Sequence, residues 1–311
     1  MATQQDCAVI IGGGTMGRDV AGIFHAAGWA TQVVEPGESA RAALAGSVPA
    51  AAQAAGIFRE GGRVSALASI AEIDWSAVRI VIECAPEKLA VKQKVFEELE
   101  KFAPAGLPLT SNSSGIPITQ IAANCQTKNR MLGLHFIKPA HLVPAVEVIR
   151  SERSDEAVAQ LVSDIMRAVR KKPVQVKKDV PGFLANRIQH ALMREAIALV
   201  DEGFASPEDV DTAVRYGFGF RYIAAGPLLQ KDLAGIDIHC AAAESIYPAL
   251  ANNTEPSPIM KNLVANGDYG VKSPGKKGFY QWDDATIARE QARYQVALAK
   301  AMQILRDEEA S

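Results

Sequence analysis

Cysteine is scarce in this sequence, and the few cysteines stand far apart. The four thiols are Cys7, Cys84, Cys125 and Cys240, and no two of them form a Cys-x-x-Cys pair. Such spacing argues against a zinc site and against a disulfide framework. Cys7 and Cys84 lie in strand-like runs, where small apolar side chains are typical of a core. We therefore expect no metal site and a reducing compartment, the cytoplasm.

Long apolar runs and an excess of one charge are also missing. No apolar run is long enough to span a bilayer, and the start, Met1 to Asp6, lacks the basic region and apolar stretch of a signal peptide. The 33 basic and 35 acidic residues give a net charge of −2, which favours neither nucleic acid nor a membrane as a partner. At 311 residues, the chain has room for two domains with a substantial core.

A glycine turn near the N-terminus organises the rest of the sequence. An apolar run, Cys7 to Ile11, leads into Gly12-x-Gly14-Thr15-Met16-Gly17, and a helix is expected to follow. The first glycine suits a tight turn, the second lets a pyrophosphate approach the backbone, and the third lets the helix pack closely. The N–H groups at the start of the helix would attract the phosphates. An ordinary glycine turn is the alternative.

Glu35 supports a dinucleotide site. It ends a second strand-like run, Thr31 to Val34, about where an acidic residue binds a ribose diol. A carboxylate at that position repels a 2′-phosphate, so the prediction is NAD rather than NADP. A surface carboxylate at the end of a strand is the alternative interpretation.

Apolar strands alternate with helical stretches up to about residue 181. This alternation predicts an α/β domain with a doubly wound, mostly parallel sheet. Ser154 is expected to cap a helix whose apolar stripe runs from Val158 to Val169, and Pro173 to stop it. After the first two runs, strands are expected at 80–84, 109–111, 131–136, 145–149 and 174–176.

The composition changes near Pro181-Gly182, where we place a domain boundary. Beyond it, residues 183–202 are expected to form one long helix, and strand signals are scarce. The sequence therefore predicts two domains, residues 1–181 and a smaller, all-α domain at residues 182–311.

A histidine and a glutamate are the residues best suited to proton transfer. His135 and Glu147 lie on separate strand-like runs, between which the chain reverses through a proline-bounded loop. A carboxylate that orients an imidazole stabilises the imidazolium formed when the ring takes a proton. Oxidation of an alcohol by NAD needs such a base. A structural histidine and a strand-end glutamate are the alternative, because a sequence does not show that they touch.

Two neutral polar residues could contact a substrate oxygen. Ser114 follows the strand expected at 109–111, and Asn186 lies early in the long helix. An ordinary cap and an ordinary helix asparagine are the alternatives.

Two cations could hold a substrate carboxylate. Lys138 lies three residues beyond His135, and Arg221 lies in an apolar turn broken by glycines. A guanidinium in apolar surroundings usually has a partner, and a carboxylate suits its bidentate geometry. An internal Asp or Glu would serve Arg221 equally well.

Taken together, these motifs resemble the L-3-hydroxyacyl-CoA dehydrogenase family over nearly the whole chain, from Val9 to Trp282. Several separated motifs in the right order specify a family better than any one of them. The matching motifs are Gly12-x-Gly14-x-x-Gly17, Glu83-Cys84-x-Pro86-Glu87-x-x-x-x-Lys92, Ser111-Asn112-x-Ser114, Gly133-Leu134-His135-Phe136, Val146-Glu147-Val148-Ile149, Pro181-Gly182-Phe183-x-x-Asn186-Arg187, Gly226-Pro227 and Gly278-Phe279-Tyr280.

The resemblance implies a Rossmann-type N-terminal domain, a helical domain that makes a homodimer contact, and substrate in the cleft between the domains. It also implies that His135 is the base and Glu147 its orienting partner. The residues implied to contact the substrate hydroxyl and carbonyl are Ser114 and Asn186, and those implied near the nicotinamide ribose are Glu87, Lys92 and Asn112.

Two departures from the family pattern argue against a CoA thioester as substrate. Members that use thioesters read His-Phe-Phe-Asn-Pro after the base, whereas this chain reads His135-Phe136-Ile137-Lys138-Pro139. Those members also carry a lysine-rich arm that suits the phosphates of CoA, whereas residues 39–69 here contain no lysine.

The turn at Arg221-Tyr222 is similar to that of relatives acting on free acids: the gulonate dehydrogenase/lambda-crystallin group, carnitine dehydrogenases and the NAD-dependent dehydrogenase of vitamin B6 breakdown. We therefore predict an NAD-dependent dehydrogenase of a small, carboxylate-bearing alcohol or aldehyde. A 3-hydroxyacyl-CoA dehydrogenase is the nearest alternative, and a protein that binds NAD without catalysis is an alternative of another class.

Overall fold

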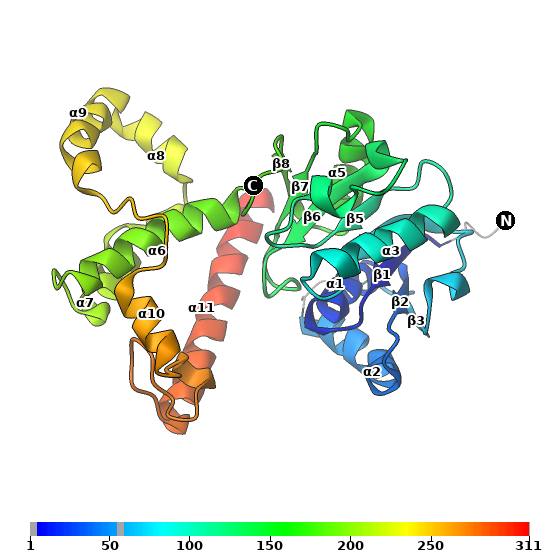
Figure 1. Cartoon of the computed structure of the whole chain (residues 1–311), viewed down its shortest axis with the longest axis horizontal. Coiled ribbons are helices and arrows are strands. Elements are labelled where there is room, and N and C mark those ends of the chain that lie inside the picture. Colours follow the sequence, from blue (N-terminus) through cyan, green and yellow to red (C-terminus); the bar gives the residue numbers. More distant parts are fainter. Residues whose placement is uncertain (1–4, 55–58, 311) are drawn as a thin grey trace. The chain divides into compact units, whose positions relative to one another are not determined.

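The computed structural model of the chain describes residues 5–54 and 59–310, with side chains described up to residue 308. Met1 to Gln4, on which the prediction of no signal peptide mainly rests, lie outside the described residues. The chain divides into two compact units, Met1–Arg187 and Ile188–Ser311, called unit 1 and unit 2 (Figure 1).

Unit 1 is built on one eight-stranded sheet with the order β3-β2-β1-β4-β5-β6-β7-β8. Every neighbouring pair is parallel except β6 with β7. The expected doubly wound, mostly parallel sheet is thus confirmed. Its strands are β1 (Cys7–Ile11), β2 (Ala30–Val34), β3 (Arg63–Leu67), β4 (Val78–Glu83), β5 (Leu109–Ser111), β6 (Met131–Phe136), β7 (Ala145–Ile149) and β8 (Lys172–Val176).

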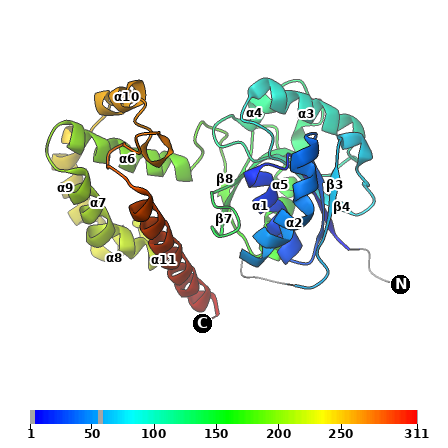
Figure 2. The ribbon, with the colours of Figure 1, turned by 90° about the horizontal axis from the view of Figure 1, so that it is seen from below.

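Helices cover both faces of this sheet, which is why its central strands are apolar on both sides. Ala8 and Ile10 of β1 belong to the core under α1, α2 and α5, whereas Val9 and Ile11 belong to the core under α3 and α4 (Figure 2). The helices are α1 (Thr15–Ala26), α2 (Glu38–Ala54), α3 (Leu89–Phe102), α4 (Ile118–Ile121) and α5 (Glu156–Ala168), with short 3-10 turns η1 (Ile70–Glu72) and η2 (Lys128–Arg130).

The strand order places the predicted motifs at one edge of the sheet. The chain leaves β1 on one side to form β2 and β3 and returns on the other side as β4. Ligands of such sheets bind at the carboxyl ends of the strands, beside this reversal of direction. The turn after β1, the end of β4 and the end of β5 all lie at that edge.

Two local predictions around α5 are wrong. The N-cap of α5 is Asp155, because the Ser154 hydroxyl instead donates to the Met131 carbonyl at 2.7 Å. The helix ends before Pro173, because Arg170 adopts a φ of 59° and the Lys171 N–H donates to the Met166 carbonyl, as in a Schellman motif. Pro173 therefore lies within β8.

Unit 2 is helical, as expected, and α6 leads into it from unit 1. No strand occurs in the part of unit 2 that the structure describes, and none of its apolar side chains is fully buried. Its elements are α6 (Ala185–Asp201), α7 (Pro207–Thr212), the π-helix η3 (Ala213–Phe218), η4 (Gly219–Ile223), α8 (Pro227–Ala234), α9 (Ile236–Ile246), η5 (Tyr247–Ala249), α10 (Pro258–Ala265), η6 (Gly270–Lys272) and α11 (Asp284–Ala310).

No helix in the described part of the chain combines the length and the apolar character needed to cross a membrane.

Candidate active site

The pairing of β6 with β7 sets His135 directly opposite Glu147. The two side chains meet on one face of the sheet, with His135 Nδ1 2.7 Å from Glu147 Oε2, and both are almost completely buried. The other carboxylate oxygen of Glu147 accepts hydrogen bonds from the N–H groups of Leu184 at 2.9 Å and Ala185 at 2.8 Å. Both carboxylate oxygens of Glu147 are therefore held in place.

These contacts determine which nitrogen of His135 is free. Burial alone would raise the pKa of Glu147, but the hydrogen bonds from His135 and from the Ala185 and Leu184 amides outweigh it and lower that pKa below the ordinary value. An ionised carboxylate only accepts hydrogen bonds, so Nδ1 of His135 carries the proton. Nε2 is then the nitrogen that can take a proton from a substrate.

Ser114, Asn112 and Asn186 lie together beside this pair. The Asn112 side-chain carbonyl accepts a hydrogen bond from the Phe136 N–H at 2.8 Å, directly after His135. The Asn186 amide donates to the Ser114 carbonyl at 3.3 Å. The Ser114 hydroxyl makes no hydrogen bond within the part of the chain that the structure describes. Three polar residues expected at the site are thus brought together beside the pair, two from the end of β5 and one from the start of α6.

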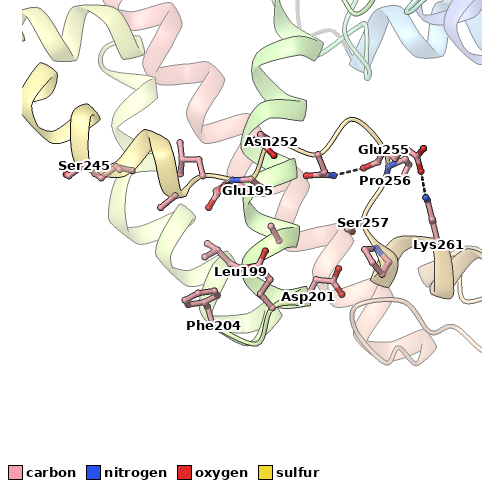
Figure 3. A pocket seen from close by; sticks show the side chains of 18 residues that line it. Glu195, Leu199, Asp201, Phe204, Ser245, Asn252, Glu255, Pro256, Ser257 and Lys261 are labelled. Carbon is pink, nitrogen blue, oxygen red and sulfur yellow. Dashed lines mark hydrogen bonds and ion pairs between the residues drawn. The ribbon is translucent and has the colours of Figure 1, made fainter.

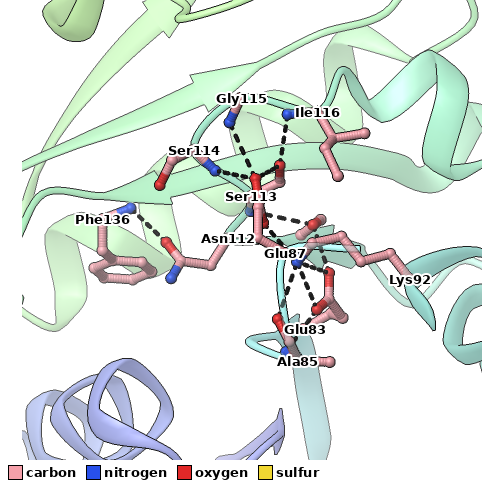
Figure 4. A network of polar contacts seen from close by, with 11 residues as sticks. Glu83, Ala85, Glu87, Lys92, Asn112, Ser113, Ser114, Gly115, Ile116 and Phe136 are labelled. Atoms are coloured by element: carbon pink, nitrogen blue, oxygen red, sulfur yellow. Dashed lines mark hydrogen bonds and ion pairs between the residues drawn. The ribbon is translucent and has the colours of Figure 1, made fainter. Parts of the chain in front are cut away.

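Glu87 and Lys92 belong to a polar network beneath these residues (Figure 4). The Lys92 ammonium lies 2.9 Å from Glu83 Oε1 and 3.2 Å from Glu87 Oε2, and only 1% of its side chain is exposed. Glu87 in turn accepts from the Ser113 hydroxyl at 2.6 Å and from the Ser114 N–H at 3.1 Å. Lys92 is thus too buried to touch a ligand itself, and it acts on the site through Glu87.

Partial burial of Glu87 favours its neutral form, yet the pKa of this carboxyl is lowered, because the Ser113 hydrogen bond and the Lys92 charge outweigh burial. Glu83 and Ser113 also belong to this network, although no role was predicted for either, and Glu83 appears above only as part of a motif. Glu83 is fully buried and also accepts from the Ser111 hydroxyl at 2.6 Å. A charged residue ending the apolar run Ile80-Val81-Ile82 was the signal that could have found it.

The turn after β1 has the geometry that a dinucleotide requires. Gly12 has a φ of 103°, and a Cβ on Gly17 would lie 1.8 Å from the Gly12 carbonyl oxygen. Gly14, the N-cap of α1, has no neighbouring atom where a Cβ would be, and no side chain caps the helix. The first N–H groups of α1 therefore face open space, which suits a pyrophosphate.

Glu35 is fixed onto the same turn. Its Oε2 accepts from the Gly13 N–H at 2.8 Å, and its Oε1 accepts from the Gly37 N–H at 2.9 Å. The carboxylate at the end of β2 is thus oriented beside the glycine turn, where a ribose diol of a bound dinucleotide would lie.

Lys138 and Arg221 lie in different units. Lys138 is exposed on the loop after β6, and Arg221 is exposed on η4. The Arg221 guanidinium carbon lies 6.0 Å from the centre of the Phe220 ring. Among the described residues no carboxylate lies within ion-pair distance of Arg221, so the internal Asp or Glu partner considered above is not found there.

A separate pocket of about 830 Å³ lies within unit 2, between α6 and the chain from Ser245 to Lys261 (Figure 3). Its acidic lining residues include Glu195 and Asp201, and its cation Lys261 is paired with Glu255 at 2.5 Å. Such a lining repels anions, so this pocket suits neither a carboxylate nor a dinucleotide. No group of three or more potential metal ligands occurs in the described residues.

Comparison with known proteins matches two family models to this chain. The NAD-binding domain of 3-hydroxyacyl-CoA dehydrogenase matches residues 7–180, and the C-terminal domain of 3-hydroxyacyl-CoA dehydrogenase matches residues 182–282. Together they cover nearly all of unit 1 and unit 2 as far as residue 282.

Two individual relatives differ in the substrate that their names give. A 5-formyl-3-hydroxy-2-methylpyridine 4-carboxylate 5-dehydrogenase of Mesorhizobium japonicum is 34% identical over 230 residues, 73% of this chain and 74% of that protein. A 3-hydroxybutyryl-CoA dehydrogenase of Mycobacterium tuberculosis is 33% identical over 282 residues, 88% of this chain and 97% of that protein. The crystal structure of a dehydrogenase of the first kind, described as an NAD⁺-dependent dismutase, has a TM-score of 0.86 at 31% identity and covers 97% of this chain and 99% of its own.

The nucleotide turn of unit 1, the two matching family models and these relatives agree. The chain belongs to the 3-hydroxyacyl-CoA dehydrogenase family and is an NAD-dependent oxidoreductase.

Proposed function

We propose that this oxidoreductase oxidises a small, carboxylate-bearing alcohol or aldehyde, such as a hydroxy acid or a pyridine aldehyde acid. The observation that carries the proposal is the Arg221 guanidinium, which has no carboxylate partner among the described residues. A guanidinium binds a carboxylate through two parallel hydrogen bonds. The Mesorhizobium relative, whose name includes both a formyl and a carboxylate group, supports the same substrate class.

In this proposal His135 is the general base. Glu147 holds the Nδ1 proton, so Nε2 takes the proton of the substrate hydroxyl, and the carbonyl forms as the adjacent C–H bond breaks. NAD, when bound, accepts the hydride from that carbon. With an aldehyde substrate, His135 instead takes a proton from water as it adds to the carbonyl carbon, and the hydrate is then oxidised to the carboxylate.

The other proposed roles follow from position. Ser114 offers its hydroxyl and Asn186 its amide to the substrate oxygen, and Lys138, like Arg221, is a cation that can bind a carboxylate. The glycine turn would hold the pyrophosphate of NAD, through Gly12, Gly14, Thr15, Met16 and Gly17, and Glu35 would hold a ribose. Glu87, oriented by Lys92, and Asn112 would lie near the nicotinamide ribose.

A paired assay tests the substrate class. One arm supplies acetoacetyl-CoA with NADH, and the other supplies free keto acids with NADH and aromatic aldehyde acids with NAD. We expect turnover in the free-acid arm. Efficient reduction of acetoacetyl-CoA would instead support 3-hydroxybutyryl-CoA dehydrogenase activity, as the name of the Mycobacterium relative suggests.

Replacing Arg221 with methionine is expected to raise KM for the free acid at least tenfold, because the substrate loses a charge-assisted hydrogen-bond partner worth about 1.5–3 kcal/mol. NADH affinity, measured by fluorescence titration, should stay within twofold. Arg215→Met is the matched control, since Arg215 is an exposed arginine of the same unit stacked on Tyr216 at 5.2 Å. Equal KM values for the two variants would refute the role of Arg221.

We also propose that a second copy of the chain covers unit 2. Leu228 and Leu233 of α8 are 82% and 77% exposed, and Ile238 of α9 is 63% exposed. A unit that keeps all its apolar side chains in contact with water lacks the buried surface that offsets its conformational entropy. An identical chain offers the same apolar surface in return, which is the self-complementary interface of a two-fold dimer.

The double variant Leu228→Asp/Leu233→Asp is therefore expected to be monomeric at a protein concentration of about 10 μM, whereas the unsubstituted protein is expected to be dimeric at the same concentration. Size-exclusion chromatography with light scattering gives the mass. Leu161→Asp is the control, because Leu161 is also exposed but lies on α5 of unit 1. A dimer that survives the double substitution would place the interface elsewhere.

A further inference from the structure

A buried lysine lies behind the loop that joins the two strands of the His135–Glu147 pair. This loop, residues 137–144, carries Lys138 and connects β6 to β7. The Lys171 ammonium donates to the Ala140 carbonyl at 2.6 Å and to the Val143 carbonyl at 2.8 Å. Lys171 is only 6% exposed, and no step of the proposed reaction uses it.

The local backbone explains how a lysine comes to point inward here. Arg170, with its positive φ, ends α5 and reverses the chain, so that Lys171 stands between the helix and β8. The next residue also binds the 137–144 loop, because the Lys172 N–H donates to the Pro144 carbonyl at 2.9 Å. Three carbonyls of the 137–144 loop are therefore held by two consecutive residues.

The ammonium of Lys171 is bound by carbonyl oxygens alone. Among the described residues no carboxylate forms an ion pair with it, and burial lowers the pKa of Lys171 to about 8. Burial of a cation without a counter-ion costs free energy. We therefore attribute the burial of the Lys171 ammonium to the loop carbonyls that it binds. Ala140 is fully buried, and its carbonyl needs a donor that the loop backbone does not supply.

A second side chain of the same loop approaches α1. His141 Nδ1 lies 3.2 Å from Asp19 Oδ2 of α1, although without hydrogen-bond geometry.

We propose that Lys171 is a positioning residue: it holds the 137–144 loop in one conformation and thereby fixes where Lys138 meets the substrate carboxylate. The inference rests on the proposed function for the role of Lys138. It adds that the substrate-binding lysine is placed by a second lysine that never contacts the substrate.

Hydrogen exchange tests the positioning without any substrate. The Leu142 and Val143 N–H groups both donate to the Pro139 carbonyl inside the loop. In Lys171→Met, which keeps the length of the side chain but removes its donors, we expect these two amides to exchange at least tenfold faster. The Val148 amide of β7 should be unchanged. Unchanged loop exchange in this variant would overturn the proposal.

A double-mutant cycle tests the consequence for the substrate. KM is measured with 5-formyl-3-hydroxy-2-methylpyridine 4-carboxylate for Lys171→Met, Lys138→Met and the double variant. We expect each single variant to raise KM at least fivefold and the double variant to match Lys138→Met, because residues acting through one contact are not additive. NADH affinity should stay within twofold, and Lys178→Met, an exposed lysine beyond β8, is the control.

The possible failures are distinct. Additive effects, or a normal KM in Lys171→Met, would overturn the role of Lys171 and leave the proposed function intact. A normal KM in Lys138→Met would remove the substrate role of Lys138, and the proposed link from Lys171 to the substrate would fall with it. If Lys171→Met does not fold, Lys171→Gln, which keeps one donating amide, is expected to show the same effects at smaller size.

Discussion

Replacing His135 with alanine is expected to lower kcat at least a hundredfold while NADH binds as before. General bases contribute about 10²- to 10⁴-fold to a rate, and the imidazole opposite Glu147 is the group that we propose takes the substrate proton. NADH affinity should not change, because the glycine turn and Glu35 are separate from the pair. Steady-state kinetics with the best free acid, together with fluorescence titration of NADH, measure both quantities.

Glu147→Ala should show a loss of similar size, because Nδ1 of His135 then has no carboxylate to orient it. The double variant His135→Ala/Glu147→Ala is expected to be no slower than His135→Ala, since groups that act as one unit are not additive. Glu98→Ala, which removes an exposed carboxylate of α3, is the control. Near-normal turnover in either single variant would remove the assignment of the pair.

Two glycine substitutions in the nucleotide turn are expected to weaken NADH binding for different physical reasons. In Gly17→Ala the new methyl would lie 1.8 Å from the Gly12 carbonyl oxygen, so the turn must shift. We expect NADH affinity to fall at least tenfold and the free energy of unfolding to drop by about 1–3 kcal/mol, the usual cost of overpacking. Calorimetry and NADH titration measure the two effects.

Gly14→Ala is the matched contrast, because no atom lies within 4 Å of the added methyl and the backbone φ of −64° suits alanine. Its stability should stay within about 0.5 kcal/mol of the unsubstituted protein, as for a surface change. NADH should still bind at least tenfold more weakly, because the methyl occupies the space that a pyrophosphate needs. Normal NADH binding by Gly14→Ala would mean that the phosphates lie elsewhere.

The sheet could be predicted from the sequence wherever strands are apolar. Runs such as Met131–Phe136 and Ala145–Ile149 are buried on both faces and stand out from their surroundings. The strand Arg63–Leu67 escaped prediction because it is a short edge strand in which no side chain is fully buried, and it follows directly on a glycine turn. Such a strand is specified by its pairing with β2 rather than by its own pattern.

Some features of the site could not be predicted because they depend on burial of charged groups. Two neighbouring lysines illustrate this point: Lys171 and Lys172 are chemically identical, yet Lys171 is buried and Lys172 is exposed. Only the reversal at Arg170 decides which of them points inward. Lys92 is similar, since a sequence shows its spacing from Glu87 but not the Glu83 carboxylate beneath it.

The pairing of β6 with β7 limits how the length of this chain can vary. Side chains alternate between the faces of a sheet, so one inserted residue within either strand would move His135 or Glu147 to the opposite face. Insertions between the strands change the 137–144 loop without moving that pair. Homologous chains that share the chemistry can therefore differ in loop length here, but gaps in an alignment should not fall inside 131–136 or 145–149.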